Sequence, residues 1–249
     1  MNKKLILFDY DGTIVDSAKM IVKGAIEAFR KCGLPDPDPN KVKENIGKPL
    51  AIALEVYAPN GYAVNPERIS DAYKEWYAEQ GRLGLQDEPI FSGMLKLLYD
   101  LKSNKDFMLG VATNKSRIAL NNGLKKHNLT EIFDITLTTD ESEPKPHPDM
   151  AIKAMSKLGL SKDNVIIVGD TVNDIGLGVN AGITSIGVSW GYNSVDMLKS
   201  EGADFIVEDS EELFLIINNL WNMFLKLLLK SENGFYHLFL NEVKVKTPE

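Results

Sequence analysis

The sequence predicts an α/β fold, a doubly wound, Rossmann-like parallel sheet interrupted by an all-helical domain. Six short runs rich in β-branched and other apolar residues are expected to be strands, over residues 5–8, 107–112, 135–139, 165–168, 183–188 and 205–207. Helical patterns lie between the later runs, over residues 93–103, 116–127, 147–158 and 171–181. Strands that alternate with helices of this length indicate βαβ units in a parallel sheet. Runs that are apolar on both faces suit strands covered by helices on both sides.

Residues 16–87 break this alternation and are expected to form a second, helical domain. Apolar side chains recur at helical spacing over residues 17–31, 41–57 and 66–79, and the prolines of residues 35–39 separate the first two of these segments. Such a segment is far too long for a crossover loop. The predicted organisation is therefore a split core, residues 1–15 and 88–249, with a helical insert at residues 16–87.

Composition excludes several classes of protein. The chain carries 28 Lys and Arg against 35 Asp and Glu, a net charge of −7, which argues against binding to nucleic acid or to an anionic membrane. A single cysteine, Cys32, allows neither an intrachain disulfide nor a cysteine zinc site. The apolar run near the N-terminus is too short for a signal peptide. We expect a soluble, cytoplasmic protein, monomeric or homodimeric, that acts on a small molecule.

The C-terminal segment is unusually apolar. Residues 213–229 contain 13 apolar residues in 17, and their few polar side chains share one helix face. The segment is a poor membrane span, because it is short and contains asparagines and a lysine. We expect a final helix packed on the sheet; a dimer surface and a membrane-surface helix are the alternatives, and the sequence leaves the role of residues 213–249 open.

Two acids follow the first predicted strand, in the run Phe8-Asp9-Tyr10-Asp11-Gly12. Ligands of open α/β sheets bind beyond the carboxyl ends of the strands. Alternate side chains of a strand share a direction, so Asp9 and Asp11 would point the same way if the strand continued past Phe8. The ordinary alternative is a turn, in which Asp and Gly are common.

Three later strand ends also carry polar residues. Asp170 follows the strand at 165–168 and Asp174 lies four residues on, Thr113 and Asn114 follow the strand at 107–112, and Lys145 stands between two prolines that stiffen its backbone. Each has an ordinary explanation as a helix cap, a dipole-compensating acid or a solvated lysine. Together, however, they should converge on one edge of the sheet. Crowded carboxylates need a cation, and an all-oxygen set suits Mg²⁺; a lysine and a hydroxyl beside it suit a phosphate.

These polar residues resemble the four motifs of the haloacid dehalogenase (HAD) superfamily and follow the same order. The motifs are Asp-Tyr-Asp-Gly-Thr at residues 9–13, then Thr113, then Lys145, then Gly169-Asp170 with Asp174. The resemblance covers about residues 4–212. It implies a Rossmann-like core with a helical C1 cap inserted after the first motif. Three further segments are similar to those of the phosphoglycolate phosphatase-like branch: Asp16-Ser17, the run from Lys145 to Asp149, and residues 202–204.

The resemblance also implies roles for the residues. Asp9 would be the nucleophile that forms an aspartyl-phosphate, and Asp11 the general acid and base. Lys145 would neutralise charge on the phosphoryl group. Thr113 and Asn114 would bind that group. Mg²⁺ would be held by Asp9, the backbone carbonyl of Asp11 and Asp170, with Asp174 either near the metal or orienting Lys145.

Two further features bear on the substrate. Dehalogenases of this superfamily lack an acid at the position of Asp11, so the acid in this sequence supports phosphate chemistry. Tyr10 stands where the family more often has an aliphatic residue or Phe, but it is also bulky and apolar, so we expect no change of chemistry. The turn at residues 45–49 would close over the site, where Gly47 and Lys48 could meet an anionic substrate; the alternative is a plain turn with a solvated lysine.

The sequence therefore predicts a Mg²⁺-dependent phosphatase that hydrolyses a small, phosphoglycolate-like phosphomonoester. Alternatives within the superfamily are a sugar-phosphate mutase, a pyrophosphatase and a nucleotide phosphatase. The alternative outside enzymes is a catalytically silent binding module, which the intact Asp9, Asp11, Lys145 and Asp170 argue against.

Overall fold

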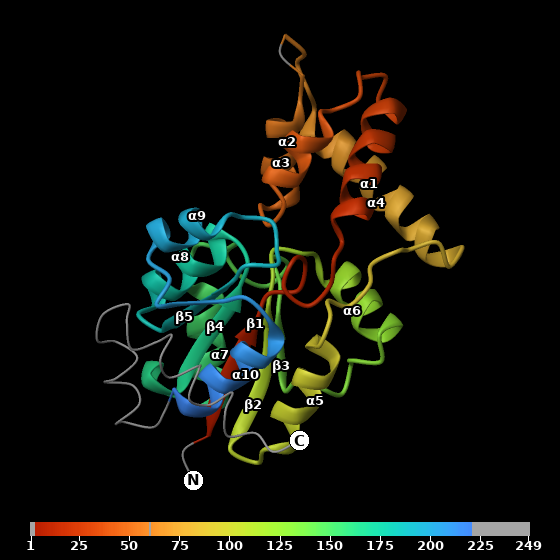
Figure 1. Ribbon diagram of the computed structural model, residues 1–249. Helices are drawn as coiled ribbons and strands as arrows, with labels where there is room; N and C mark the ends of the chain where they lie inside the picture. Colours follow the sequence, from red (N-terminus) through yellow and green to blue (C-terminus); the bar gives the residue numbers. More distant parts are fainter. Residues whose placement is uncertain (1–2, 60, 221–249) are drawn as a thin grey trace.

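A computed structural model describes residues 3–59 and 61–220 and has a six-stranded sheet in which every neighbouring pair of strands is parallel. The strand order is β3-β2-β1-β4-β5-β6 (Figure 1). The strands are β1 (Lys4–Phe8), β2 (Phe107–Ala112), β3 (Ile135–Leu137), β4 (Val165–Gly169), β5 (Thr184–Val188) and β6 (Phe205–Val207). The predicted fold class is confirmed, and β1 at the centre has β2 and β4 as its neighbours.

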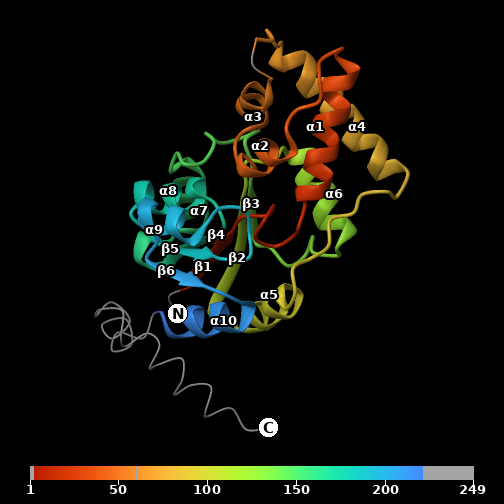
Figure 2. The same cartoon turned by 45° about the horizontal axis from the view of Figure 1, so that its top comes forward.

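Helices cover both faces of this sheet, as Figure 2 shows. One face packs against α5 (Met94–Ser103), α6 (Arg117–Lys126) and α10 (Ser210–Asn219). The other face packs against α7 (Asp149–Leu158), α8 (Val172–Ala181) and α9 (Val195–Glu201), and a short 3-10 helix, η1 (Lys162–Asn164), precedes β4. This is the arrangement that strands apolar on both faces require.

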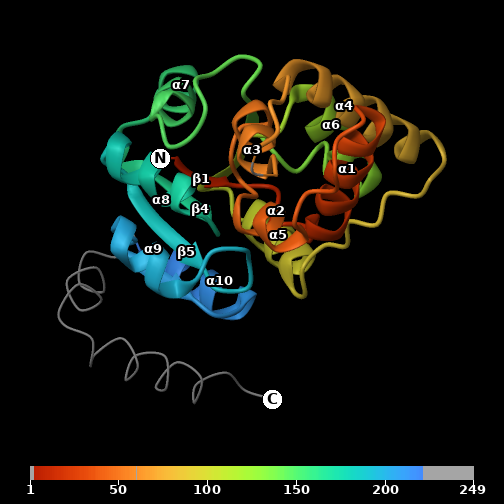
Figure 3. The same ribbon diagram turned by 90° about the horizontal axis from the view of Figure 1, so that it is seen from above.

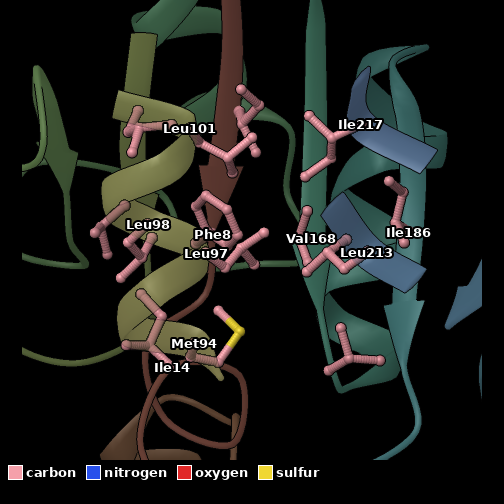
Figure 4. Packing of buried hydrophobic residues seen from close by; sticks show 14 of the residues in the cluster. Phe8, Ile14, Met94, Leu97, Leu98, Leu101, Val168, Ile186, Leu213 and Ile217 are labelled. Carbon is pink, nitrogen blue, oxygen red and sulfur yellow. The ribbon is translucent and has the colours of Figure 1, made fainter. Parts of the chain in front are cut away.

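The alternation of side chains in β1 divides the core in two. Ile6 and Phe8 join the apolar cluster under α5 and α10, whereas Leu5 and Leu7 join the cluster under α7 and α8. All four are fully buried. Figure 4 shows Phe8 next to side chains of α5, and side chains of α10 next to those of β4 and β5. Burial of this kind stabilises by about 1.5–3 kcal/mol per large side chain, so the strand that carries Asp9 is rigidly held.

Four helices form a separate unit beside the carboxyl ends of the strands (Figures 1 and 3). They are α1 (Ala18–Lys31), α2 (Pro39–Glu44), α3 (Leu50–Tyr57) and α4 (Pro66–Arg82). Their own apolar cluster includes Phe29, Leu54 and Ile69. The Asp38 and Asn65 side chains cap α2 and α4, each directly before a proline in the first turn, where a missing N–H costs nothing.

Several element boundaries differ from those predicted. The strand expected to reach residue 139 ends at Leu137, because the N–H and hydroxyl of Thr138 donate to Glu141 and turn the chain. The helical pattern at 41–57 is two helices, α2 and α3, separated by the turn at 45–49, and α2 begins at Pro39, inside the stretch expected to be only a break.

The start of the apolar C-terminal segment packs on the core, as predicted. Leu213, Ile216, Ile217 and Leu220 are buried in the cluster beneath α10. The rest of the predicted helix, residues 221–229, lies outside the described residues. Within residues 3–59 and 61–220, no helix is both long and apolar enough to cross a membrane.

Candidate active site

The candidate site lies where the order of the strands reverses direction. β2 and β3 extend from one side of β1, and β4, β5 and β6 from the other. A crevice forms beyond the carboxyl ends of the strands at such a point. Asp9 follows β1 and Asp170 follows β4, and the Asp9 N–H donates to the carbonyl of Val168, 2.9 Å away, so the two acids begin side by side.

Three of the predicted acids meet in this crevice. Carboxylate oxygens of Asp9, Asp170 and Asp174 lie within 4.8 Å of one another, and all three side chains are buried. Glycines make room for them: a Cβ on Gly12 would lie 2.2 Å from an Asp170 oxygen, and one on Gly191 would lie 2.1 Å from the Asp170 Cβ. Gly12 also has a φ of +88°, which a side chain would strain.

Lys145 is the cation of this cluster. Its side chain is only 1% exposed, and its ammonium lies 2.8 Å from Asp9 Oδ1 and also contacts Asp174 Oδ1. Burial alone would lower the pKa of Lys145, but Asp174 and Asp9 outweigh that effect and raise it, so the lysine is charged. The stiff backbone predicted for Lys145 is held further by Asn114, whose amide donates to the Lys145 carbonyl and accepts from its N–H.

The electrostatics of the cluster fit a divalent cation. Burial, together with Asp174, raises the pKa of Asp9 to about 7 despite the opposing effect of Lys145. Burial and the charges of Asp174 and Asp9 also raise the pKa of Asp170. Three carboxylates against one ammonium leave a formal excess of two negative charges in a buried space. An all-oxygen set with this charge suits Mg²⁺.

Asp174 is already occupied by protein contacts. One oxygen meets Lys145, and the other accepts from the N–H and hydroxyl of Thr171 at the start of α8, at 3.0 and 2.7 Å. Asp170 is also anchored, since Thr13 Oγ1 donates to one of its oxygens and the Tyr192 N–H to the other, each at 2.9 Å. Asp174 is therefore placed to hold Lys145 in position.

The loop after β2 brings Thr113 and Asn114 to the crevice, where they do different things. The Thr113 side chain is buried, and its oxygen accepts only a long contact, 3.3 Å, from the N–H of Lys115. Its hydroxyl proton can therefore point to a ligand. The Asn114 amide, in contrast, is used in bonds to Lys145 and to the Gly47 carbonyl, 2.8 Å away.

The turn predicted to close over the site does touch the core. The Gly47 carbonyl accepts from Asn114 and, at 3.2 Å, from Asn173. Gly47 has a φ of +93°, and a Cβ there would come within 2.8 Å of Thr171, so only glycine fits this approach. Lys48 is exposed and donates to Asn45 Oδ1 at 2.7 Å.

β1 ends at Phe8 and the chain then turns, with the Gly12 N–H bonded to the Val15 carbonyl, so the continued strand that would align Asp11 with Asp9 is not formed. The carboxylate of Asp11 instead pairs with Lys115, whose ammonium lies 3.0 Å from both of its oxygens. Within the described part of the chain, the carboxylate cluster is Asp9, Asp170 and Asp174; Asp11 is not a member of it but lines the same cleft as Asp9.

Sequence reasoning missed the residues behind Asp11. Lys115 also lies 3.9 Å from Glu88 Oε1, and the Tyr77 hydroxyl of α4 donates to the same glutamate. Glu88 and Lys115 are both buried or nearly so. Burial alone would lower the pKa of Lys115, but Asp11 and Glu88 raise it. The only sequence signal was the position of Lys115 directly after Thr113 and Asn114; nothing near Glu88 marked it.

Comparisons with known proteins agree with this geometry. Residues 6–188 match the family model described as haloacid dehalogenase-like hydrolase. Probable phosphatase IndB of Dickeya dadantii is 34% identical over 85% of this chain and 92% of its own, and a phosphoglycolate phosphatase of Aquifex aeolicus is 31% identical over 87% and 97%. The crystal structure of a predicted phosphatase from Clostridium acetobutylicum superposes with a TM-score of 0.76 at 29% identity, covering 88% of this chain and all of the other.

The fold and the site together define a hydrolase with a buried cluster of aspartates and a lysine at the point where the strand order of a parallel sheet reverses. The chain belongs to the haloacid dehalogenase-like hydrolase family, and it is an enzyme of the phosphatase kind within it.

Proposed function

We propose that the protein is a Mg²⁺-dependent phosphatase that hydrolyses a small phosphomonoester through an aspartyl-phosphate on Asp9. The observation that carries this proposal is the cluster of Asp9, Asp170 and Asp174 around the buried ammonium of Lys145. Asp9 directly follows the buried central strand β1, and its Oδ1 lies 2.8 Å from the Lys145 ammonium. A carboxylate held in this way is a nucleophile with a cation beside it.

Each residue has a task in this scheme. Asp9 and Asp170, with the backbone carbonyl of Asp11, would hold Mg²⁺, which when bound would neutralise charge between the carboxylates and a phosphate dianion. Lys145 stabilises the negative charge that grows on the phosphoryl oxygens, and the Thr113 hydroxyl donates to one of them. Asp174 positions Lys145, and Asn114 positions the loop that carries it.

Asp11 would act on the leaving oxygen. As general acid it protonates that oxygen when the ester bond breaks, and as general base it takes a proton from the water that attacks the aspartyl-phosphate. Lys115 holds the Asp11 carboxylate at 3.0 Å in the structure and so positions it on the cleft side of the nucleophile.

Residues 16–87 form the cap domain of this enzyme. The two chain segments that join it to the core run together: the Asp16 N–H donates to the Pro89 carbonyl, and the Phe91 N–H to the Ile14 carbonyl, at 2.8 and 3.0 Å. A hinge made of two paired segments of this kind would let the cap move as one piece. Phosphoglycolate is the first substrate to test, because the sequence resembles that branch of the superfamily.

The test is phosphate release from p-nitrophenyl phosphate and from a panel of about a hundred phosphorylated metabolites with Mg²⁺, compared with Asp9→Asn. Asp9→Asn keeps the shape of the side chain but removes the attacking charge, so turnover should fall by a factor on the order of 10³ or more. Acid quenching during turnover should trap phosphate on the wild-type protein and none on the variant.

Retention of more than a few per cent of activity by Asp9→Asn would contradict the nucleophile assignment. Transfer of the phosphoryl group to a sugar phosphate, with no release of phosphate, would instead support the mutase alternative. No turnover of any ester would leave the silent binding module as the better interpretation.

A further inference from the structure

The cleft between the cap and the core is large for a two-carbon substrate. Its volume is about 630 Å³, and Asp9, Asp11 and Thr113 lie on its core side. Cavities of about 300–1,000 Å³ are typical of sites for ligands of drug size. Phosphoglycolate has only a two-carbon acid beyond its phosphate, so it would leave most of this space to water.

The cap side of the cleft is mostly apolar and aromatic. α3 contributes Leu50 and Tyr57, and α4 contributes Tyr73 and Tyr77, whose rings stack with their centroids 5.4 Å apart. Ile46, next to the turn that touches the core, lies on the same side. Surfaces of this kind bind an apolar or flat group, and apart from the tyrosine hydroxyls they offer a carboxylate little compensation for the water it would lose.

The charge near Asp11 also bears on the leaving group. A substrate with its phosphoryl group at Asp9 must place its ester oxygen near Asp11. There, Lys115 is the adjoining ammonium, and it already faces two carboxylates, Asp11 at 3.0 Å and Glu88 at 3.9 Å. In the general-acid step Asp11 carries a proton, so Lys115 and Glu88 balance each other and the formal sum of the three groups is zero. An anionic group close to the ester oxygen would therefore find no net positive charge to compensate for the water it loses in this buried setting.

Two other lysines line the cleft, but both are exposed. Lys48 donates to Asn45, and Lys74 lies on the outer part of α4. Charges at an exposed rim are screened by water and salt. They can attract a phosphorylated compound to the cleft, but they poorly compensate an anionic group that is buried next to the ester oxygen.

We propose that the alcohol part of the substrate is uncharged next to the ester oxygen, apolar or aromatic beyond it, and much larger than glycolate. This inference rests on the proposed phosphatase function and concerns the leaving-group side of the same site. It separates this enzyme from one built for phosphoglycolate or pyrophosphate, whose leaving groups are both anionic.

The first test compares three phosphate esters of primary alcohols, which need similar help from a general acid: benzyl phosphate, ethyl phosphate and phosphoglycolate. The full-length enzyme with Mg²⁺ should give the highest kcat/KM with benzyl phosphate, about tenfold or more above ethyl phosphate, because the apolar cleft binds the ring. Phosphoglycolate should give the lowest value, about tenfold or more below ethyl phosphate.

Two variants, each with a control variant, show which side chains cause these preferences. Glu88→Gln removes one negative charge behind Lys115 and should raise the ratio of kcat/KM for phosphoglycolate to that for ethyl phosphate by roughly tenfold. Glu67→Gln, a matched change at an exposed glutamate of α4, should leave this ratio within about twofold. Tyr73→Ala should lower the ratio of benzyl to ethyl phosphate by about tenfold, whereas Tyr73→Phe should preserve it.

Because each result is a ratio of two substrates on one preparation, a loss of folded protein cancels. A wild-type preference for phosphoglycolate over ethyl phosphate would overturn the inference while leaving the phosphatase function intact. So would ratios that Glu88→Gln and Tyr73→Ala do not move. Failure to hydrolyse all three esters and p-nitrophenyl phosphate would overturn the phosphatase function and the inference with it.

Discussion

Lys145 is the residue whose removal the structure predicts to be most disruptive, because two buried carboxylates share its ammonium. Lys145→Met keeps the length of the side chain and removes the ammonium that lies 2.8 Å from Asp9 Oδ1 and contacts Asp174. Removing one partner of a buried ion pair costs about 3–5 kcal/mol, because the other charge is left unpaired. Since a domain of this kind is stable by about 5–15 kcal/mol, the loss is a large share of the total.

The loss should depend on pH in a stated direction. Burial and Asp174 already raise the pKa of folded Asp9 from 3.8 to about 7. A carboxyl whose folded pKa is raised binds its proton more tightly in the folded state, so its contribution to stability is present below about pH 4 and is lost as the pH rises through 7. Removing Lys145 raises this pKa further. Lys145→Met should therefore be more destabilised, relative to the wild type, at about pH 8 than at about pH 5.

The measurement is urea unfolding at both pH values, with EDTA and with Mg²⁺, together with turnover of p-nitrophenyl phosphate. Lys153→Met is the matched control, because Lys153 also pairs with an aspartate, Asp149, at 2.6 Å, but with both side chains partly exposed; it should cost about 0–1 kcal/mol. Mg²⁺ should restore part of the stability of Lys145→Met but not its activity, which should stay about 10²–10³-fold below that of the wild type. The reasoning is refuted if the two variants are equally stable at pH 8 in EDTA.

Three further outcomes are expected. Asp11→Asn should slow phosphorylation by alkyl phosphates much more than by p-nitrophenyl phosphate, whose leaving group needs no proton, in single-turnover experiments; equal losses would remove Asp11 from the acid role. Mg²⁺ should raise the Tm more at pH 8 than at pH 5, because Asp9 with a pKa of about 7 must lose its proton to bind a cation. Ca²⁺ should also raise the Tm but support turnover poorly. An unchanged Tm with Mg²⁺ would contradict a metal site. Truncation after Glu212 removes the side chains of α10 that lie buried on the sheet and should cause aggregation. A chain that ends at Ser231 should stay soluble and active. Equal heat stability of the two truncated proteins would show that α10 is not part of the core.

The sequence by itself determined the fold class, the strands and the acids at their ends. Runs that are apolar on both faces can be satisfied only between two layers of helices, and parallel strands bring their carboxyl ends to one edge. Asp9, Asp170 and Asp174 therefore meet as predicted, although residues 9 and 170 are far apart in the chain. Lys145 was predictable for the same reason, because the prolines around it limit where its backbone can go.

Only the tertiary structure decided the surroundings of Asp11. Its pairing with Lys115 depends on where β1 ends and on how the chain turns at Gly12, and a strand one or two residues longer would have aimed the acid elsewhere. The contact of Lys115 with Glu88 depends on the path of the segment that leaves α4. Periodicity and strand order specify which edge a residue reaches, but the partner of a side chain on a loop is set by packing between loops that are distant in sequence, and no local pattern encodes it.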